Sequence, residues 1–120
     1  MERSVYEIGN AKTTVIFPKR NSCIATKDLR DILNADKITG DIVIIHDENV
    51  PGEFINYYST AFAPKAVISL GDNKKNTDTY LEIISGLSSL NFKKNDMLVA
   101  VGGGSTTDIA GFVACTYKRG

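Results

Sequence analysis

The feature that most constrains the fold is a run of four branched apolar residues at positions 42–45, in the segment DIVIIHDENV. A strand with one face in water alternates apolar and polar side chains, whereas a strand inside a parallel sheet reads as a continuous apolar run. Similar short runs recur at residues 65–70 and 96–101. The sequence therefore predicts a parallel sheet, whose neighbouring strands must be joined by crossovers.

Segments with helical spacing lie between and after these runs. Residues 51–64 repeat apolar side chains every three or four positions until Pro64, which cannot continue a helix. Residues 76–90 show the same period, with Asn76 or Thr77 as N-cap. Residues 106–120 predict the helix that follows the last strand.

Upstream, residues 13–18 predict a strand closed by proline, and residues 22–33 a short strand followed by a helix. The alternation of strands and helices predicts a Rossmann-like α/β domain over residues 1–120. Right-handed crossovers would cover its parallel sheet with helices on both faces.

The composition narrows the class of partner. The 120 residues are enough for one domain, and 14 basic and 14 acidic side chains give no net charge. We therefore expect no nucleic-acid or membrane partner, and a small-molecule ligand instead. The chain shows no 18-residue apolar span and no signal peptide, which predicts a soluble, cytoplasmic protein. Cys23 and Cys115 are expected to be buried, reduced thiols rather than a disulfide.

Ligands of parallel sheets bind beyond the carboxyl ends of the strands. The segments at these ends are HDEN, GDNKKN and GGGSTTD. In the third, Gly102, Gly103 and Gly104 allow a phosphate or ribose to approach the backbone, and the start of the following helix favours an anion. Ser105 is the expected N-cap, with Asp108 in the first helical turn.

Each of these residues also has a purely structural interpretation. A tight turn needs glycine in any case, and Asp108 could only complement the helix dipole. Asp47 could accept hydrogen bonds from ribose hydroxyls or form a turn. Asp72 and Lys75 could face the crevice together or belong to a solvated loop.

The remaining candidates are fewer. Arg119, beside Lys118, could hold a phosphate or offset the helix terminus. His46 is the only histidine. Because a metal site usually needs several ligands, we expect it to have a structural role rather than to bind a metal. No Gly-Lys-Ser/Thr phosphate loop is present, and Thr107 stands where the G-x-G-x-x-G fingerprint requires glycine.

The segment LVAVGGGSTTDIAGFVACTYKRG resembles the signature of 3-dehydroquinate synthase and its relatives, the sugar phosphate cyclases. The family pattern is a strand, GGGVxGD and then (A/G)GF-A-x-x-Y-x-RG. Two weaker similarities lie upstream, where HDENV resembles T-D-x-N-V and GDNKK resembles G-E-x-x-K. In iron-type alcohol and glycerol dehydrogenases the same turn has the sequence GGGSxxD. The residues that favour the cyclases instead are Gly111, Phe112, Tyr117, Arg119 and Gly120.

The resemblance implies roles for particular residues. Those that match the family's NAD contacts are Asp47, Asp72, Lys75, Gly103, Gly104, Ser105 and Asp108. By this resemblance Asp47 holds the adenosine ribose, Asp72 and Lys75 contact the nicotinamide side, and the glycine turn lies under the pyrophosphate. Arg119 matches an arginine that reaches the substrate phosphate. Ser105 and Thr107 depart from the family's valine and glycine, and Asp72 from its glutamate.

The resemblance also implies an activity, a carbon–oxygen lyase of the shikimate pathway that leads to aromatic amino acids. The family uses NAD to oxidise a seven-carbon sugar phosphate, eliminates phosphate and closes a carbocycle, with a zinc or cobalt ion. The metal ligands and catalytic lysines of the family follow in a helical C-terminal domain. We therefore expect residues 1–120 to be an incomplete N-terminal part, inactive alone and homodimeric at full length. The alternatives are the same part of a polyol dehydrogenase, or a non-catalytic nucleotide-binding module.

Overall fold

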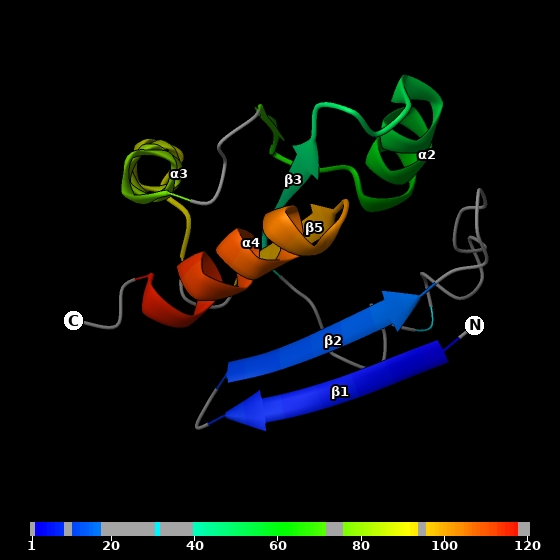
Figure 1. Ribbon diagram of the computed structural model, residues 1–120, viewed down its shortest axis with the longest axis horizontal. Coiled ribbons are helices and arrows are strands. Elements are labelled where there is room, and N and C mark those ends of the chain that lie inside the picture. The colour runs from blue at the N-terminus through cyan, green and yellow to red at the C-terminus, as the bar shows by residue number, and fades with distance from the viewer. Residues whose placement is uncertain are drawn as a thin grey trace.

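The computed structural model describes residues 2–8, 11–17, 31, 40–71, 76–93 and 96–117. Its helices and strands follow in the order shown in Figure 1: β1 Glu2–Ile8, β2 Ala11–Phe17, β3 Ile42–Asp47, α2 Gly52–Phe62, β4 Ala66–Leu70, α3 Thr77–Ser89, β5 Met97–Val101 and α4 Gly104–Thr116. Strand and helix alternate from β3 onward, as the sequence predicts.

A three-stranded parallel sheet forms the centre of the α/β part, in the order β4-β3-β5. Ile44 of β3 pairs with Val67 of β4 and with Val99 of β5. As the central strand, β3 is covered on both faces, and residues 42–45 are all buried. The prediction drawn from the four branched residues is therefore confirmed.

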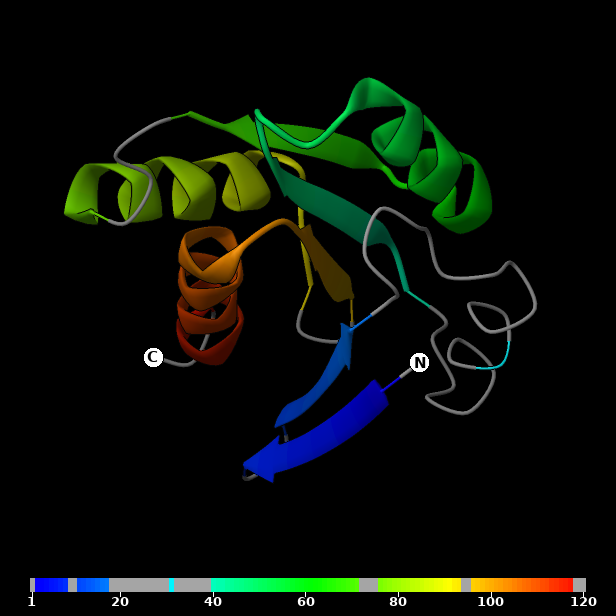
Figure 2. The same cartoon turned by 45° about the vertical axis from the view of Figure 1, so that its right-hand side comes forward.

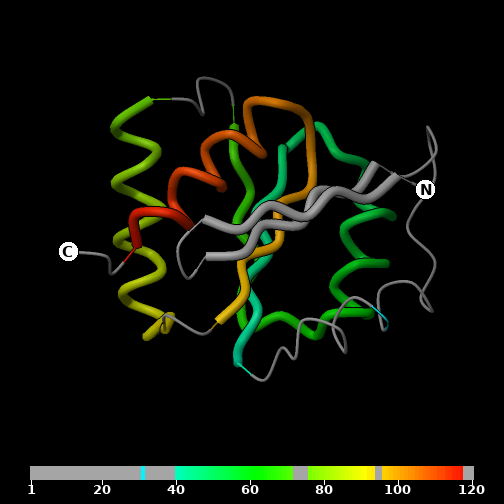
Figure 3. The backbone as a smooth tube through the Cα atoms, turned by 90° about the horizontal axis from the view of Figure 1, so that it is seen from below, coloured from blue at the N-terminus to red at the C-terminus, as the bar shows by residue number. Residues whose placement is uncertain are grey.

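Helices cover both faces of this sheet. On one face, α3 and α4 pack their buried residues Ile83, Leu87 and Val113 against Val43 and Ile45. On the other face, α2 places Tyr58 against Ile44. Figure 3 shows α2 and α3 on opposite sides of the strands. This is the doubly covered α/β arrangement that the alternating sequence predicts.

The N-terminal strands do not join the parallel sheet, and here the prediction was incomplete. β2 pairs antiparallel with β1 in a separate two-stranded sheet, with Ile8 opposite Ala11. Figure 1 shows this hairpin as a distinct layer beside the α/β part. Of the segment 22–33, only Asp31 is among the described residues, and it is helical.

The helix ends agree with the predictions at α2 and α3. α2 ends at Phe62, where Ala63 takes a left-handed conformation with φ 48° just before Pro64. Asn76 caps α3, because its side chain accepts a hydrogen bond from the backbone amide of Thr79 at 2.9 Å. Leu81, although it fits the helical period of α3, is 55% exposed.

The prediction that Cys115 is buried was wrong. It is a free, exposed thiol on α4. The buried stripe of this helix consists of Thr106, Ile109, Ala110 and Val113, and Cys115 lies off this stripe. Cys23 lies outside the described residues. Within the described ranges, no helix is both long and apolar enough to cross a membrane.

Candidate functional site

The path of the chain through the sheet defines where a ligand could bind. From β3 the chain enters α2 on one face, and from β5 it enters α4 on the opposite face. The two connections diverge between neighbouring strands, so the carboxyl ends of β3 and β5 form the topological switch point of the sheet. Open parallel sheets bind their ligands at such a point.

Asp47 and Gly102 meet at this switch point. Asp47 is the last residue of β3, and the pairing of His46 with Val101 brings it beside Gly102. Gly102 has φ 151°, and a Cβ atom there would lie 3.1 Å from Cβ of both Asp47 and Thr106. Both the backbone conformation and the packing therefore require glycine at position 102.

Gly103 and Gly104 differ from Gly102, because a Cβ atom at either position would meet nothing within 4 Å. Both are exposed, and Gly103 has φ −83°, which any residue adopts. Packing does not require glycine at these two positions. Both stand at the start of α4, where the first amides of a helix lack intrahelical acceptors and favour an anion. Figure 2 shows β5 leading through this turn into α4.

The predicted cap of α4 was wrong. Gly103, not Ser105, is the N-cap, and no side chain caps the helix. Because α4 begins at Gly104, Asp108 is its fifth residue and lies beyond the first turn. The hydroxyl of Thr107 donates to the backbone oxygens of Gly103 at 3.2 Å and Gly104 at 3.1 Å. The departure from the family's glycine at position 107 therefore adds hydrogen bonds within the turn.

Asp47 makes the turn contact that one of its two interpretations predicts. Its Oδ1 accepts a hydrogen bond from the backbone amide of Asn49 at 2.9 Å, and its backbone oxygen accepts one from the amide of Val50 at 3.0 Å. A carboxylate can accept about four hydrogen bonds, so this turn is compatible with a ligand contact. Nδ1 of His46 lies 2.9 Å from the backbone oxygen of Asp47, a contact that suits the predicted structural role.

Glu48 extends the row of polar groups toward β4, and sequence reasoning did not single it out. Its amide donates to the backbone oxygen of Leu70 at 2.9 Å, and its Oε2 lies 3.4 Å from where a Cβ atom of Gly71 would be. The carboxylate thus stands at the start of the 71–75 segment. Asp72 and Lys75 lie outside the described residues, as do Lys118 and Arg119.

Thr106 is the second residue that sequence reasoning missed. Its side chain is fully buried, and its Oγ1 is the one buried side-chain polar atom in the described part of the chain without a hydrogen-bond partner. The signal was its place on the helical stripe with Ile109, Ala110 and Val113, at the period that marks the buried face. A threonine at that position predicts a buried hydroxyl.

No group of three His, Cys, Asp or Glu side chains suited to a metal occurs among the residues that the structure describes. The arrangement instead combines open glycine backbone at a helix start with a carboxylate on the neighbouring strand. Such a pair can hold a ligand that carries both a phosphate and hydroxyl groups.

Comparisons with known proteins agree with this geometry. The family model described as the 3-dehydroquinate synthase N-terminal part matches residues 65–120. The 3-dehydroquinate synthase of Clostridium acetobutylicum is 39% identical over 120 residues, covering 95% of this chain and 33% of that protein. The 2-epi-valiolone synthase of Actinosynnema mirum is 33% identical over 84 residues, covering 69% and 22%.

A solved structure shares the fold. A 2-deoxy-scyllo-inosose synthase, crystallised with carbaglucose-6-phosphate, NAD⁺ and Co²⁺, superposes with a TM-score of 0.68 at 20% identity, covering 99% of this chain and 33% of its own. The chain thus spans a third or less of the length of these relatives. Over residues 65–120 it matches the N-terminal part of 3-dehydroquinate synthase, and over nearly its whole length it is similar to that enzyme and to a sugar phosphate cyclase.

Proposed function

We propose that this chain is the NAD-holding part of a cytoplasmic 3-dehydroquinate synthase, a carbon–oxygen lyase that forms a carbocycle from a seven-carbon sugar phosphate in the shikimate pathway. The observation that carries the proposal is the pair Gly103 and Gly104, which face open space beside Asp47 at the switch point of the sheet. Packing does not require glycine at either position. Close approach of a ligand to the backbone would explain why both residues are glycine.

The turn suits the pyrophosphate of NAD. Backbone amides at Gly103, Gly104 and Ser105 begin α4, and the positive end of the helix dipole favours the negative phosphates. Asp47, one strand away, would accept hydrogen bonds from the adenosine ribose. The cyclase with the same fold was crystallised with NAD⁺, which supports this choice of cofactor.

Four further residues are assigned on the family resemblance. Asp72 and Lys75 would contact the nicotinamide side, and Asp108 would follow the pyrophosphate turn. Arg119 would bind the substrate phosphate bidentately, as a guanidinium does. When bound, NAD supplies the hydride acceptor that such a reaction requires. The protein's part is to orient the cofactor and substrate.

The metal ion is assigned to another part of the protein. Because the described residues hold no ligand cluster, none of them is given a metal role. We expect zinc or cobalt to be held by a second, helical domain, which would also carry the catalytic lysines. Residues 1–120 would then form the N-terminal NAD-binding domain of a homodimer and produce no dehydroquinate alone.

The test is a calorimetric titration of NAD into the purified chain. Saturable binding is expected, weakened about tenfold or more by Asp47→Ala, which removes the ribose acceptor, and by Gly104→Val, which fills the open space. Cys115→Ser, at the other end of α4, is the matched control and should bind normally. A folded chain that does not bind NAD would contradict the proposal.

Turnover separates the proposal from its nearest alternative. In the protein that carries the metal-binding residues, phosphate release from a seven-carbon sugar phosphate is expected. Reversible reduction of NAD by glycerol, without phosphate release, would instead identify an iron-type polyol dehydrogenase.

A further inference from the structure

The Thr106 hydroxyl is an unusual feature of the first turn of α4. The side chain is 0% exposed, and Oγ1 has no hydrogen-bond partner. Leaving a buried hydroxyl unpaired costs free energy, and a valine of the same shape would avoid this cost. A purely structural role therefore does not account for threonine at this position.

The other threonines of α4 show what would satisfy such a hydroxyl. Thr107 donates to the backbone oxygens of Gly103 and Gly104, and Thr116 donates to that of Phe112 at 2.8 Å. For Thr106 the oxygen four residues earlier belongs to Gly102. That residue precedes the N-cap and has φ 151°, so it lies outside the helical ladder. The local backbone therefore does not provide the usual acceptor.

The side chain of Asp47 lies close to this hydroxyl. A Cβ atom built on Gly102 would lie 3.2 Å from Oγ1 of Thr106 and 3.1 Å from Cβ of Asp47. The hydroxyl on α4 and the aspartate at the end of β3 therefore approach the same point. The glycine at position 102 is what lets them come so close.

We propose that Thr106 is a positioning residue for Asp47, whose carboxylate accepts a hydrogen bond from the Thr106 hydroxyl when the ligand is bound. Oδ1 of Asp47 accepts a hydrogen bond from the amide of Asn49 at 2.9 Å. A rotation of the carboxylate toward Thr106 would bring it to the buried hydroxyl, which would then fix its orientation for the hydroxyls of the ligand. The inference rests on the proposed function, because NAD is the ligand that makes the carboxylate turn.

Two substitutions at position 106 separate this role from a structural one. Thr106→Val keeps the shape and removes the hydroxyl, so the melting temperature should stay or rise while NAD binds about tenfold more weakly. Thr106→Ser keeps the hydroxyl and removes a buried methyl group, so the melting temperature should fall while NAD binds as in the wild type. A structural role predicts that neither substitution weakens binding.

The matched control is Thr116→Val on the same helix. Its hydroxyl contacts Tyr80 at 2.6 Å, so its loss should lower stability and leave NAD affinity unchanged. The role of Asp47 is tested by combining Thr106→Val with Asp47→Ala. In the Asp47→Ala background the threonine substitution should no longer weaken NAD binding.

Each other outcome overturns the inference in a distinguishable way. Wild-type affinity in Thr106→Val would reject the inference and leave the proposed function intact. A tenfold loss that persists in the Asp47→Ala background would mean that the hydroxyl acts on the ligand without Asp47. A folded wild-type chain that does not bind NAD would reject the proposed function together with the inference.

Discussion

At the scale of single residues, the three consecutive glycines have different reasons to be glycine. Gly102 is required by its φ of 151° and by the side chains of Asp47 and Thr106, whereas Gly103 and Gly104 border open space. The sequence could indicate that glycine was needed in the turn. It could not show which of the three glycines packing requires, because that depends on which Cβ position would meet a neighbouring side chain.

We expect Gly102→Ala to lower the free energy of unfolding by roughly 1–3 kcal/mol, because alanine is strained at positive φ and its Cβ atom would crowd Asp47. Gly103→Ala is the matched control, and it should change stability by less than about 0.5 kcal/mol. Urea denaturation of the two variants measures both values. Equal stabilities would mean that the turn relaxes to accommodate a side chain at position 102.

At the scale of elements, the sequence predicted the repeating part of the fold and missed the N-terminal hairpin. β3, β4 and β5 and helices α2 and α3 lie within a few residues of their predicted bounds, because apolar period and capping residues are local signals. The signal for the hairpin was also local. Gly9 and Asn10 separate two runs that pair at Ile8 and Ala11, and such a dipeptide favours a hairpin turn.

The start of α4 was misplaced for a physical reason. Ser105 followed by Asp108 resembles a capping box, but the helix begins at Gly104, since the turn after β5 is completed by Gly102 and Gly103. Side-chain preferences alone do not reveal that the turn between β5 and α4 is only two residues long.

The N-cap of α3 provides a test of a capping contact that the sequence did predict. Asn76→Ala should lower the free energy of unfolding by about 1 kcal/mol, because the amide of Thr79 loses the side-chain oxygen that it donates to. Thermal denaturation followed by circular dichroism measures the change. Asn56→Ala, at an exposed position inside α2, is the control and should not destabilise the protein. An unchanged melting temperature for Asn76→Ala would mean that water replaces the cap at no cost.

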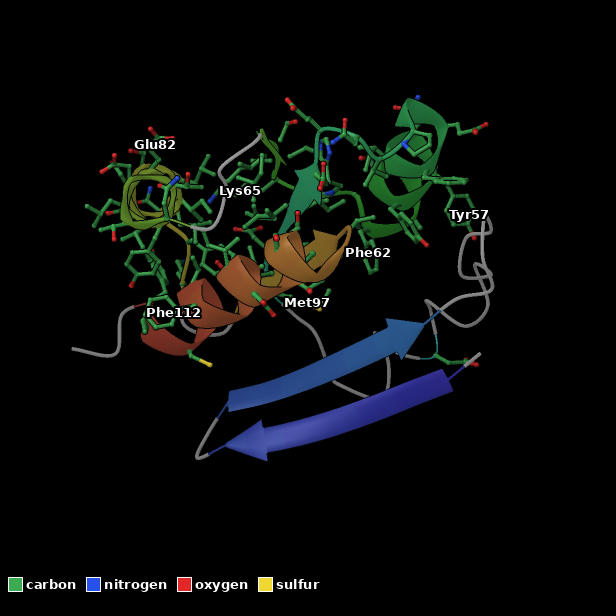
Figure 4. The ribbon with its side chains drawn as sticks, viewed as in Figure 1. Tyr57, Phe62, Lys65, Glu82, Met97 and Phe112 are labelled. Atoms are coloured by element: carbon green, nitrogen blue, oxygen red, sulfur yellow. The ribbon has the colours of Figure 1, made fainter. Side chains whose placement is uncertain are left out.

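Beside the shared apolar cluster, the contact between α3 and α4 includes an aromatic pair and a hydroxyl pair. The rings of Tyr80 and Phe112 have centroids 4.9 Å apart, and Tyr80 OH lies 2.6 Å from Oγ1 of Thr116. Figure 4 shows Phe112 projecting from α4 on the side of α3. Tyr80→Phe keeps the ring and removes the hydroxyl, so it should cost about 1 kcal/mol.

A double-mutant cycle isolates this hydrogen bond. Because Thr116→Val removes the other hydroxyl, the loss caused by Tyr80→Phe should shrink by about 0.5–1 kcal/mol in that background. Full additivity of the two substitutions in urea denaturation would show that the hydroxyls contribute independently.

At the scale of the whole molecule, the candidate site follows from sheet topology more than from any single residue. Strand order β4-β3-β5 brings Asp47 and the glycine turn together although they are separated by more than fifty residues. The sequence predicted their proximity through the rule that parallel strands end at one edge. The helical period of α4 indicates that Thr106 is buried, but it does not indicate that its hydroxyl lacks a hydrogen-bond partner, because that depends on the backbone of the preceding turn.

The same topology leaves β4 and β5 as the two edges of the parallel sheet, since neither pairs with another strand among the described residues. Unpaired strand edges promote association between copies of a chain, and Val67 on β4 is 44% exposed.

We expect the isolated chain to self-associate as its concentration rises, which sedimentation velocity measures. Val67→Lys should weaken this association roughly tenfold through charge repulsion at the edge, whereas Val67→Thr, which keeps the branched shape without the charge, should have a smaller effect. Because the side chain is already half exposed, neither substitution should lower the melting temperature by more than a few degrees. A wild-type chain that stays monomeric at all concentrations would mean that the edges are protected within the molecule itself.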